Sequence, residues 1–554
     1  MRRSILVLSG IFILACAPHA APAQSAPFPT SKWFQEVVKR PIPPAQLAGP
    51  EKLRDFVVDG KLQLSLDQAI QLALANNTNI RIDELTYQSS WYNVLAAHSP
   101  FDPIFTANGS ANRGTSPQPS QLGGASVLSS LNQTLGLNLT QFLATGTSFT
   151  VGSSTSRSSS NSSFNTFNPS YNSGLNFGFT QSLLRNRGLF VNRAPIVIAQ
   201  RGLQISRDSF ESQVSSIIQQ VVTDYWLVVL AQDNLVVDRK AVDQAQVSYD
   251  HDKRSLELGA LPPFDIYKSE SELATRKVAV IQQEYALKQA EDVLRDAIGA
   301  DLDPKIGVLD ISLVEPAEPT GELFSLDISQ AIERALAKRP ELESQRLQLD
   351  VDDINIRLAH NQMQPTLTLN GTYTAGGLGG NQFLFDTTKN PPVLTGIVPG
   401  GLGDALAQIS AFQFPTYQAS LTLSLPIRNR AAEAAVGTNE VNKKRDLFNQ
   451  RATFQSIQLE ARNAIHSLEQ AKLSIGAAKI ARDLTQKNLE AEQRKYDLGV
   501  DTIFFLLDAQ TQLQNADLTL VQAEINYQLA LTAVQHATGE LLERYHVQIK
   551  DPKP

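Results

Sequence analysis

The sequence of 554 residues contains almost no sulfur: it has one cysteine, Cys16, and two methionines. A single cysteine excludes a disulfide framework and any zinc site built from cysteines. The net charge of −7 and the lack of any basic run argue against a nucleic-acid-binding protein, because phosphate contacts require clustered Lys and Arg. Beyond the amino terminus, no apolar stretch approaches the roughly 20 residues that a membrane-spanning helix needs.

Charge is also scarce, and the scarcity is local. Charged residues make up 19% of the chain, against about 25% in an average soluble domain. Residues 103–184 and 364–427 are nearly free of charge, and their charged residues are Arg113, Arg157, Asp386, Lys389 and Asp404. Long segments exclude charge when their solvent cannot hydrate it, and lipid is the first candidate. Since no helical span is available, a membrane crossing requires a closed β-barrel.

Within both charge-poor blocks, apolar side chains alternate with small or polar ones. The alternating positions include Leu135, Leu137, Leu139, Leu175, Phe177, Phe179, Leu367, Leu369, Tyr373, Tyr417, Leu421, Leu423 and Leu425. Alternation over about ten residues is typical of a strand with one apolar face, and in an exported protein it fits a membrane barrel. We therefore expect Leu421, Leu423 and Leu425 to face lipid. Half of a soluble sandwich is the alternative interpretation.

Two proline-free stretches, residues 196–261 and 429–497, predict very long helices. At about 1.5 Å per residue, a helix of this length would reach ~100 Å, too long for a compact globular domain. Apolar residues recur in both stretches at spacings of three, four and seven, as in coiled coils. Such a long apolar stripe must be buried by neighbouring helices or subunits.

The chain repeats itself. Residues 68–75 return as 330–337, and the Leu-Gly pair at Leu258-Gly259 returns as Leu498-Gly499. This predicts a tandem duplication in which each half has a helix, a charge-poor block, a long helix, a Leu-Gly turn and a helix. The expected organisation is a signal peptide at 1–23, an extended lead-in at 24–62, a first repeat at 63–300 with its β segment at 101–185, a proline-containing connector at 301–322, a second repeat at 323–540 with its β segment at 364–427, and a tail at 541–554.

Three segments carry a family resemblance. They are residues 183–187 (Leu-Leu-Arg-Asn-Arg), residues 496–502 (Tyr-Asp-Leu-Gly-Val-Asp-Thr) and residues 507–510 (Leu-Asp-Ala-Gln). Together with the duplication, they resemble the TolC-like outer-membrane efflux protein family, the outer membrane factors. The resemblance implies a mixed α/β membrane protein: a homotrimer whose β-barrel continues into a periplasmic barrel of coiled-coil helices. Four strands per subunit would give twelve in all, and residues 131–156 supply two further strand-like pieces, either wall strands or a surface hairpin.

The resemblance also implies a function in the outer membrane. Such a channel belongs to a tripartite efflux or type I secretion system and docks through a periplasmic adaptor onto an inner-membrane pump. No motif identifies the exported substrate or the pump class. A periplasmic coiled-coil adaptor and a secreted filament or adhesin are the rival interpretations. No catalytic motif and no cofactor site is recognised, and His98 and His360, which are repeat mates, are weak candidates for metal binding.

The resemblance places the entrance gate at the two Leu-Gly turns. The positions matching the family's paired acidic constriction are Phe505 and Asp508, with pseudo-equivalents Asp265 and Lys268 in the first half. Tyr496 and Asp501 match gate-locking positions, although aspartate replaces the usual arginine at 501. The expected adaptor-docking tip comprises Leu258, Gly259, Ala260, Leu498, Gly499 and Val500.

The amino terminus predicts export. Arg2 and Arg3 precede an apolar run and the small-residue site at residues 21–23 (Ala-Pro-Ala), so we expect the mature chain to begin at Gln24. The intact mass of the mature protein tests this expectation. A lipid-modified Cys16 would contradict it, because residues 13–16 also form an acceptable lipoprotein cleavage site.

Overall fold

Two very long helices dominate the protein. They are α4 (Leu189–Glu257) and α9 (Arg430–Asp497), of 69 and 68 residues, and they confirm the helices predicted from the proline-free stretches. The computed structural model describes residues 47, 49–117, 125–163, 165–259, 262–319, 321–386, 388 and 393–549. The predicted signal peptide, Cys16 and Gln24 lie outside the described residues. Residues from Pro50 onward form one compact unit.

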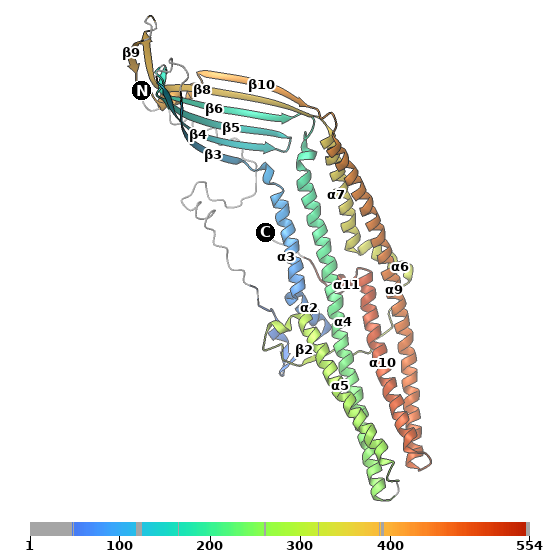
Figure 1. Ribbon diagram of the computed structural model, residues 1–554. Coiled ribbons are helices and arrows are strands. Elements are labelled where there is room, and N and C mark those ends of the chain that lie inside the picture. The colour runs from blue at the N-terminus through green and yellow to red at the C-terminus, as the bar shows by residue number, and fades with distance from the viewer. Residues whose placement is uncertain are drawn as a thin grey trace. The chain divides into compact units, whose positions relative to one another are not determined.

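The same order of elements occurs twice along this unit. A helix pair, α2 (Leu66–Asn76) and α3 (Thr78–Ala96), precedes the first strands, and α6 (Ile328–Lys338) and α7 (Pro340–Met363) precede the second set. Each long helix then turns back into a shorter one that packs beside it (Figure 1). These are α5 (Ile266–Ile298) after α4 and α10 (Ile503–Ala537) after α9, with α11 (Leu541–Arg544) following.

The largest apolar core surrounds the middle of α4. Ile218, Val222 and Tyr225 are fully buried there against α2 and α5. Among the described residues, α4 is long and apolar enough to span a membrane, by length and composition alone. The prediction that no such stretch exists is therefore wrong. Because 56% of its apolar 18-residue stretch is buried within the fold, α4 serves as a core helix.

A small sheet covers this core, and the sequence did not predict it. The lead-in forms a 3₁₀ turn (Leu53–Phe56), β1 (Val57–Val58) and β2 (Lys61–Leu64), and the connector supplies a 3₁₀ turn (Ala300–Leu302) and β7 (Ile311–Leu313). β2 pairs with β1 and, in parallel, with β7. The Tyr225 hydroxyl donates to the Leu64 carbonyl at 3.4 Å. The two segments expected to be extended connectors are thus joined to each other and to α4.

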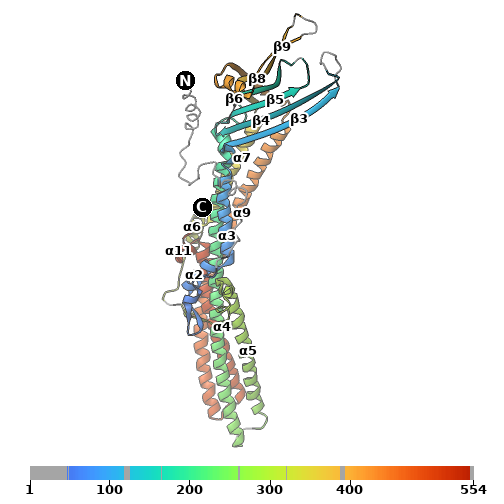
Figure 2. The same ribbon diagram turned by 90° about the vertical axis from the view of Figure 1, so that its left-hand side faces the viewer.

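The charge-poor blocks form one antiparallel sheet whose strands run in the order β10-β8-β6-β5-β4-β3, with β9 paired to the far end of β8. The strands lie side by side in both views (Figure 1, Figure 2). A short helix, α8 (Leu402–Ser410), and a 3₁₀ turn (Ser99–Phe101) accompany them. The strands are β3 (Ile104–Pro117), β4 (Val127–Leu143), β5 (Thr147–Ser160), β6 (Phe167–Ser182), β8 (Thr366–Asp386), β9 (Val393–Val398) and β10 (Phe414–Ser424).

The register of this sheet separates apolar from polar side chains. One row of cross-strand partners runs through all six strands of the main path as Phe105, Leu139, Val151, Phe177, Tyr373 and Tyr417. The next row runs as Thr106, Asn138, Gly152, Asn176, Thr374 and Thr416. Successive residues of a strand point to opposite faces. The sheet therefore has an apolar face, which carries the first row, and a polar face, which carries the second.

Residues 131–156 belong to this sheet. They lie within β4 and β5, which sit between β3 and β6, so they are not a separate surface hairpin. The chain therefore contributes six strands to the main path and not the four that the family resemblance implied. Although β5 is rich in serine, two of its residues continue the apolar face of the sheet. Val151 lies between Leu139 of β4 and Phe177 of β6, and Phe149 lies beside Phe179 of β6.

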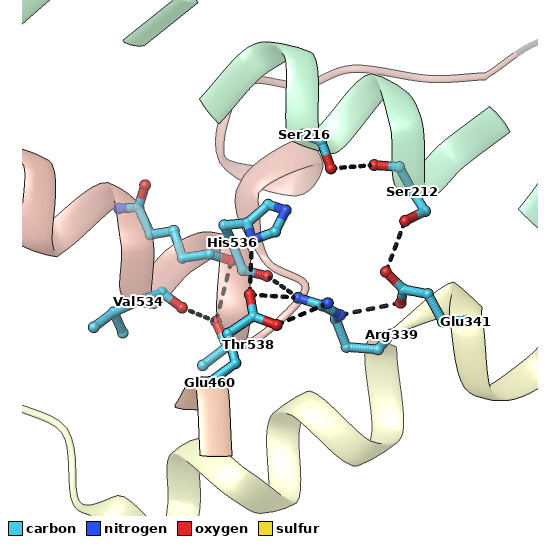
Figure 3. A network of polar contacts seen from close by, with 9 residues as sticks. Ser212, Ser216, Arg339, Glu341, Glu460, Val534, His536 and Thr538 are labelled. Atoms are coloured by element: carbon cyan, nitrogen blue, oxygen red, sulfur yellow. Dashed lines mark hydrogen bonds and ion pairs between the residues drawn. The ribbon is translucent and has the colours of Figure 1, made fainter. Parts of the chain in front are cut away.

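A polar network ties four helices together near the start of α7 (Figure 3). Arg339 binds Glu460 of α9 through two hydrogen bonds of 3.1 Å and Glu341 through one of 3.0 Å. Glu341 accepts from Ser212 of α4 at 2.7 Å, and Nδ1 of His536 in α10 lies 3.1 Å from Glu460. Burial alone would raise the pKa of Glu460, but the hydrogen bond from His536 and the charge of Arg339 outweigh burial and lower this pKa.

Replacing Arg339 should loosen this junction. We expect Arg339→Leu to lower the free energy of unfolding by about 2 kcal/mol, because Glu341 and Glu460 lose their charged partner and keep only Ser212 and His536. The measurement is denaturant unfolding in detergent, followed by circular dichroism. Since the folded Glu460 pKa is lowered, its stabilising contribution is present above the ordinary glutamate pKa and is lost as the pH falls through the folded value. The difference between variant and wild type should therefore shrink in acid.

Arg346→Leu is the matched control, because the exposed Arg346 side chain is paired with Glu343 of its own helix. It should leave the unfolding midpoint nearly unchanged. Equal destabilisation by both substitutions would show that the network has no special role.

Candidate functional site

The two helical hairpins end in turns of the same design. α4 and α9 stop at Glu257 and Asp497, and the glycines that follow, Gly259 and Gly499, have φ of 73° and 69°. This left-handed conformation favours glycine and ends a helix, as the sequence predicted. Leu258, Leu498 and Val500 are strongly exposed apolar residues at these ends, and Ala260 lies outside the described residues. Both turns lie at the end of this unit opposite the large sheet (Figure 1).

Tyr496 links the two hairpins. Its hydroxyl donates a 2.5 Å hydrogen bond to Oδ1 of Asp252 in α4, a residue that is completely buried. Nδ1 of His251 lies 3.4 Å from the same oxygen, while within the described part of the chain Oδ2 of Asp252 has no hydrogen-bond partner. Burial and the bond to Asp252 raise the pKa of Tyr496, so the hydroxyl stays protonated and available as a donor. The predicted gate-locking position is thus engaged with a buried carboxylate.

Further polar bonds run from α10 to the first hairpin. Gln510 donates to Ser248 at 3.0 Å and Gln514 donates to Asp238 at 2.7 Å, both on α4. Arg276 of α5 donates to the Thr511 hydroxyl at 2.7 Å. Of these residues the sequence reasoning singled out only Gln510, as part of a motif. The spacing of Gln510 and Gln514, which places both amides on one helical face, is a signal that could have identified this seam.

The second hairpin, by contrast, is held together by apolar contacts. Leu489 of α9 and Ile503, Leu506 and Leu513 of α10 are buried in one cluster, with Tyr496 packed against it. This hairpin end is therefore apolar within itself, and hydrogen bonds of Tyr496, Gln510, Thr511 and Gln514 join it to its neighbour. Such polar contacts can be exchanged for water at modest cost, because the net contribution of one hydrogen bond is about 1 kcal/mol.

The structure brings Lys268 and Asp508 to one groove. This groove, of about 590 Å³, lies between α5 and α10, and it is also lined by Tyr267, Phe504, Leu507 and Thr511. Asp265 precedes α5 and its carboxylate lies 3.5 Å from Nζ of Lys268. Asp508 accepts a 2.6 Å bond from Gln512 of its own helix. The groove therefore joins acidic and basic groups that are 240 residues apart in sequence.

Two other predicted gate residues lie apart from this groove's lining. The exposed Phe505 packs edge-on against Phe504, with 5.5 Å between the ring centroids. Asp501 accepts from the backbone amide of Thr502 at 2.9 Å, and Nζ of Lys495 lies 4.0 Å from its carboxylate. These contacts of Asp501 stay within the α9–α10 turn.

His98 and His360, the candidates for metal binding, belong to no group of metal-binding side chains among the described residues. Nδ1 of His98 lies 2.8 Å from the Val94 carbonyl of its own helix. Within the described ranges, no group of three or more His, Cys, Asp or Glu side chains is placed to hold a metal ion.

Two solved structures share this fold. The crystal structures of CusC match with a TM-score of 0.62 at 15% identity, covering 90% of this chain and 95% of CusC. The Campylobacter jejuni CmeC outer membrane channel matches with a TM-score of 0.60 at 18% identity, covering 89% of each chain.

Sequence relatives are named for efflux and the outer membrane. The chain is 24% identical over 357 residues to outer membrane protein TolC of Vibrio cholerae, covering 62% of this chain and 73% of that protein. It is 22% identical over 530 residues to the probable efflux pump outer membrane protein TtgC of Pseudomonas putida, covering 94% and 92%. Both relatives are named as outer membrane proteins, and their names favour neither the adaptor nor the filament interpretation.

The family model for outer membrane efflux proteins matches residues 146–300 and 331–540, well over half of the chain. The resemblance drawn from the sequence and the predicted location in the outer membrane are thereby confirmed. The chain belongs to the outer membrane efflux protein family.

Proposed function

We propose that three copies of this chain form one conduit, with their sheets closed into a barrel in the outer membrane and their helices forming a periplasmic tunnel. The observation that carries this proposal is the pair of unbroken rows, one apolar and one polar, across six strands. A barrel wall between lipid and a water-filled lumen requires these two faces. The two long helices, of 69 and 68 residues, suit a tunnel that extends away from the membrane.

The edges of the sheet support closure with other copies. β3 and β10 are the end strands of the main path, and nearly all of their residues are exposed. Since every neighbouring pair is antiparallel, β3 and β10 run in opposite directions, so β10 of one copy can pair with β3 of the next. Unpaired strand edges are not tolerated in lipid. Three copies would form a barrel of eighteen strands, the size range of porins that enclose an aqueous channel.

The two halves of the chain are proposed to be structural repeats, at 63–300 and 323–540. The recurring order of a helix pair, strands, a long helix and a shorter helix supports this proposal. So do the glycines of positive φ that end α4 and α9.

The hairpin ends are proposed to be the closed entrance. The bond from Tyr496 to Asp252 would hold the second hairpin against the first and would have to break on opening. Asp265 and Asp508 would face the mouth, and Lys268 would offset one of these two charges in each copy. The remaining negative charge, repeated three times, would attract cations. The exposed Phe505 would narrow the entrance, and Asp501 would brace its own turn.

The partners follow from the family and the exposed tip. Family members work with a periplasmic adaptor and an inner-membrane pump, and this chain is proposed to do so in a tripartite efflux or type I secretion system. The apolar ends Leu258, Leu498 and Val500, with Gly259 and Gly499, would form the adaptor-docking surface.

A charge on the apolar face should block assembly. Val151→Arg places the charge in β5, one of the two strands not implied by the resemblance, and an arginine in the bilayer interior costs about 2–4 kcal/mol. We expect the trimer to disappear from the outer-membrane fraction, as judged by native gel and by detergent extraction.

Thr150→Arg is the control, because its side chain lies on the polar face of the same strand and should be tolerated. If β4 and β5 stood outside the wall, both variants would assemble. Recovery of the wild-type protein from the soluble fraction without detergent would refute the membrane assignment.

Removing the Tyr496 hydroxyl should favour the open entrance. A hydrogen bond to a charged group contributes about 1.5–3 kcal/mol, so Tyr496→Phe should raise the open population roughly tenfold or more. Single-channel recording in planar bilayers measures this as longer and more frequent open periods.

Tyr285→Phe, in an exposed position on α5, is the matched control and should behave as wild type. In the same recordings, Asp265→Asn combined with Asp508→Asn should lower cation selectivity without opening the channel. Unchanged gating in Tyr496→Phe and unchanged selectivity in the double variant would place the gate elsewhere.

A further inference from the structure

The short helix α8 lies on the main sheet in direct backbone contact. A Cβ atom added at Gly377 would overlap the carbonyl oxygen of Ala405, and one at Gly379 would overlap the carbonyl oxygen of Gly401. Neither collision could be relieved by a side-chain movement, because both atoms that would be struck belong to the backbone. The lack of side chains at Gly377 and Gly379 of β8 therefore allows the backbone of α8 to lie directly on the strand, and we call these two glycines the glycine seat.

The register shows on which side of the sheet this seat lies. Gly377 pairs with Ser173 and Gly379 with Tyr171, and both are an even number of residues from Tyr373 in the apolar row. Side-chain positions two residues apart share one face of a strand. Consequently α8 covers the apolar face and not the polar face that would line the lumen.

Polar contacts fix α8 in this place. The Gln408 side chain accepts from the Leu378 amide at 2.9 Å and donates to the Leu378 carbonyl at 3.0 Å. Asp404 accepts from the Gly401 amide at 2.8 Å and so caps the helix. Beneath the helix, Ala405 and Ala375 are fully buried. These contacts hold α8 against β8.

The outer side of α8 is apolar and uncovered in the single chain. Leu402 and Leu406 are 38% and 46% exposed, and Phe412 just beyond the helix is 50% exposed. The Phe412 ring lies 6.3 Å from the ring of Tyr373, so this surface continues the apolar row. Asp404 is the one charged residue of α8, and it is occupied at the cap.

We infer that α8 is a membrane-interface helix, whose Leu402 and Leu406 contact outer-leaflet lipid on the outside of the barrel wall. This inference rests on the proposed function, in which the apolar face meets lipid. An apolar helix face at the bilayer boundary gains stability from the acyl chains it contacts. Because α8 carries no basic residue, its lipid contact is hydrophobic and should not depend on salt. α8 also packs against β6.

Site-directed fluorescence tests the inference on the full chain. Cys16 leaves no free thiol in the mature protein, whether it is removed with the signal peptide or lipid-modified, so single cysteines can be labelled. Leu406→Cys reports on α8, Val151→Cys on the apolar face and Thr150→Cys on the polar face. Each carries an environment-sensitive dye in liposomes of lipids with brominated acyl chains, with iodide as the aqueous quencher.

We expect brominated lipid to quench the dye at position 406 at least half as strongly as at 151, with little effect of iodide and no change at high salt. Quenching by iodide alone, as at 150, would overturn the inference. Protection from both quenchers would also overturn it, since a second copy would then cover α8. If brominated lipid quenches the dye at position 151 but not the dye at position 406, the inference fails and the proposed barrel stands. If brominated lipid quenches the dye at position 406 but not the dye at position 151, the proposed lipid contact of the sheet fails and that of α8 stands.

The glycine seat supplies a second test. Gly377→Ala should displace α8, lowering the quenching by brominated lipid at 406 at least twofold. Gly376→Ala is the matched control, because the nearest atom to its added Cβ is the Phe414 carbonyl oxygen at an ordinary 3.8 Å. Equal quenching at 406 in the two variants would contradict the seating of α8 by Gly377.

Discussion

Backbone hydrogen bonding in a medium without water is the constraint on which the rest of this structure depends. In hydrocarbon, each unpaired amide or carbonyl costs several kcal/mol, so strands can be placed there only within a closed wall. The six strands satisfy one another, but β3 and β10 each keep an unpaired edge. The chain cannot satisfy this constraint alone. In the proposed barrel, lipid covers the exposed apolar face, and the two open edges pair with further copies of the chain.

In the helical part, the kind of contact changes along α4. Around the middle of α4 the contacts are apolar, with Ile218, Tyr225 and Leu294 fully buried. Toward the hairpin ends, the seam between the hairpins includes hydrogen bonds to Asp238 and Asp252. Apolar burial is lost only by exposing surface to water, whereas a hydrogen bond can be replaced by one to water. The middle of α4 can therefore stay fixed while its contacts with α9 and α10 nearer the turn separate.

Local sequence patterns predicted individual helices and strands. They could not predict which strands and side chains, far apart in the sequence, contact each other. Proline-free stretches predicted α4 and α9, and alternation at Leu135, Leu137 and Leu139 predicted a strand. Whether that strand belongs to the wall depends on partners in β3 and β5, which alternation does not identify. The helix α8 was missed because it lies inside a block with strand-like composition. Tyr496 was recognised, but its partner Asp252 is 244 residues away.

The parallel pairing of β2 with β7 sets the order in which the chain can fold. Leu62 and Leu64 of β2 pair with Ile311 and Leu313 of β7. During export, the lead-in emerges first and must wait for about half of the polypeptide before its partner strand arrives. Until then, the apolar core around α4 lacks Ile311, although Leu64, the partner of the Tyr225 hydroxyl, is already present. Before its second half is exported, the chain therefore exposes apolar surface that the finished fold buries, and such surface favours aggregation.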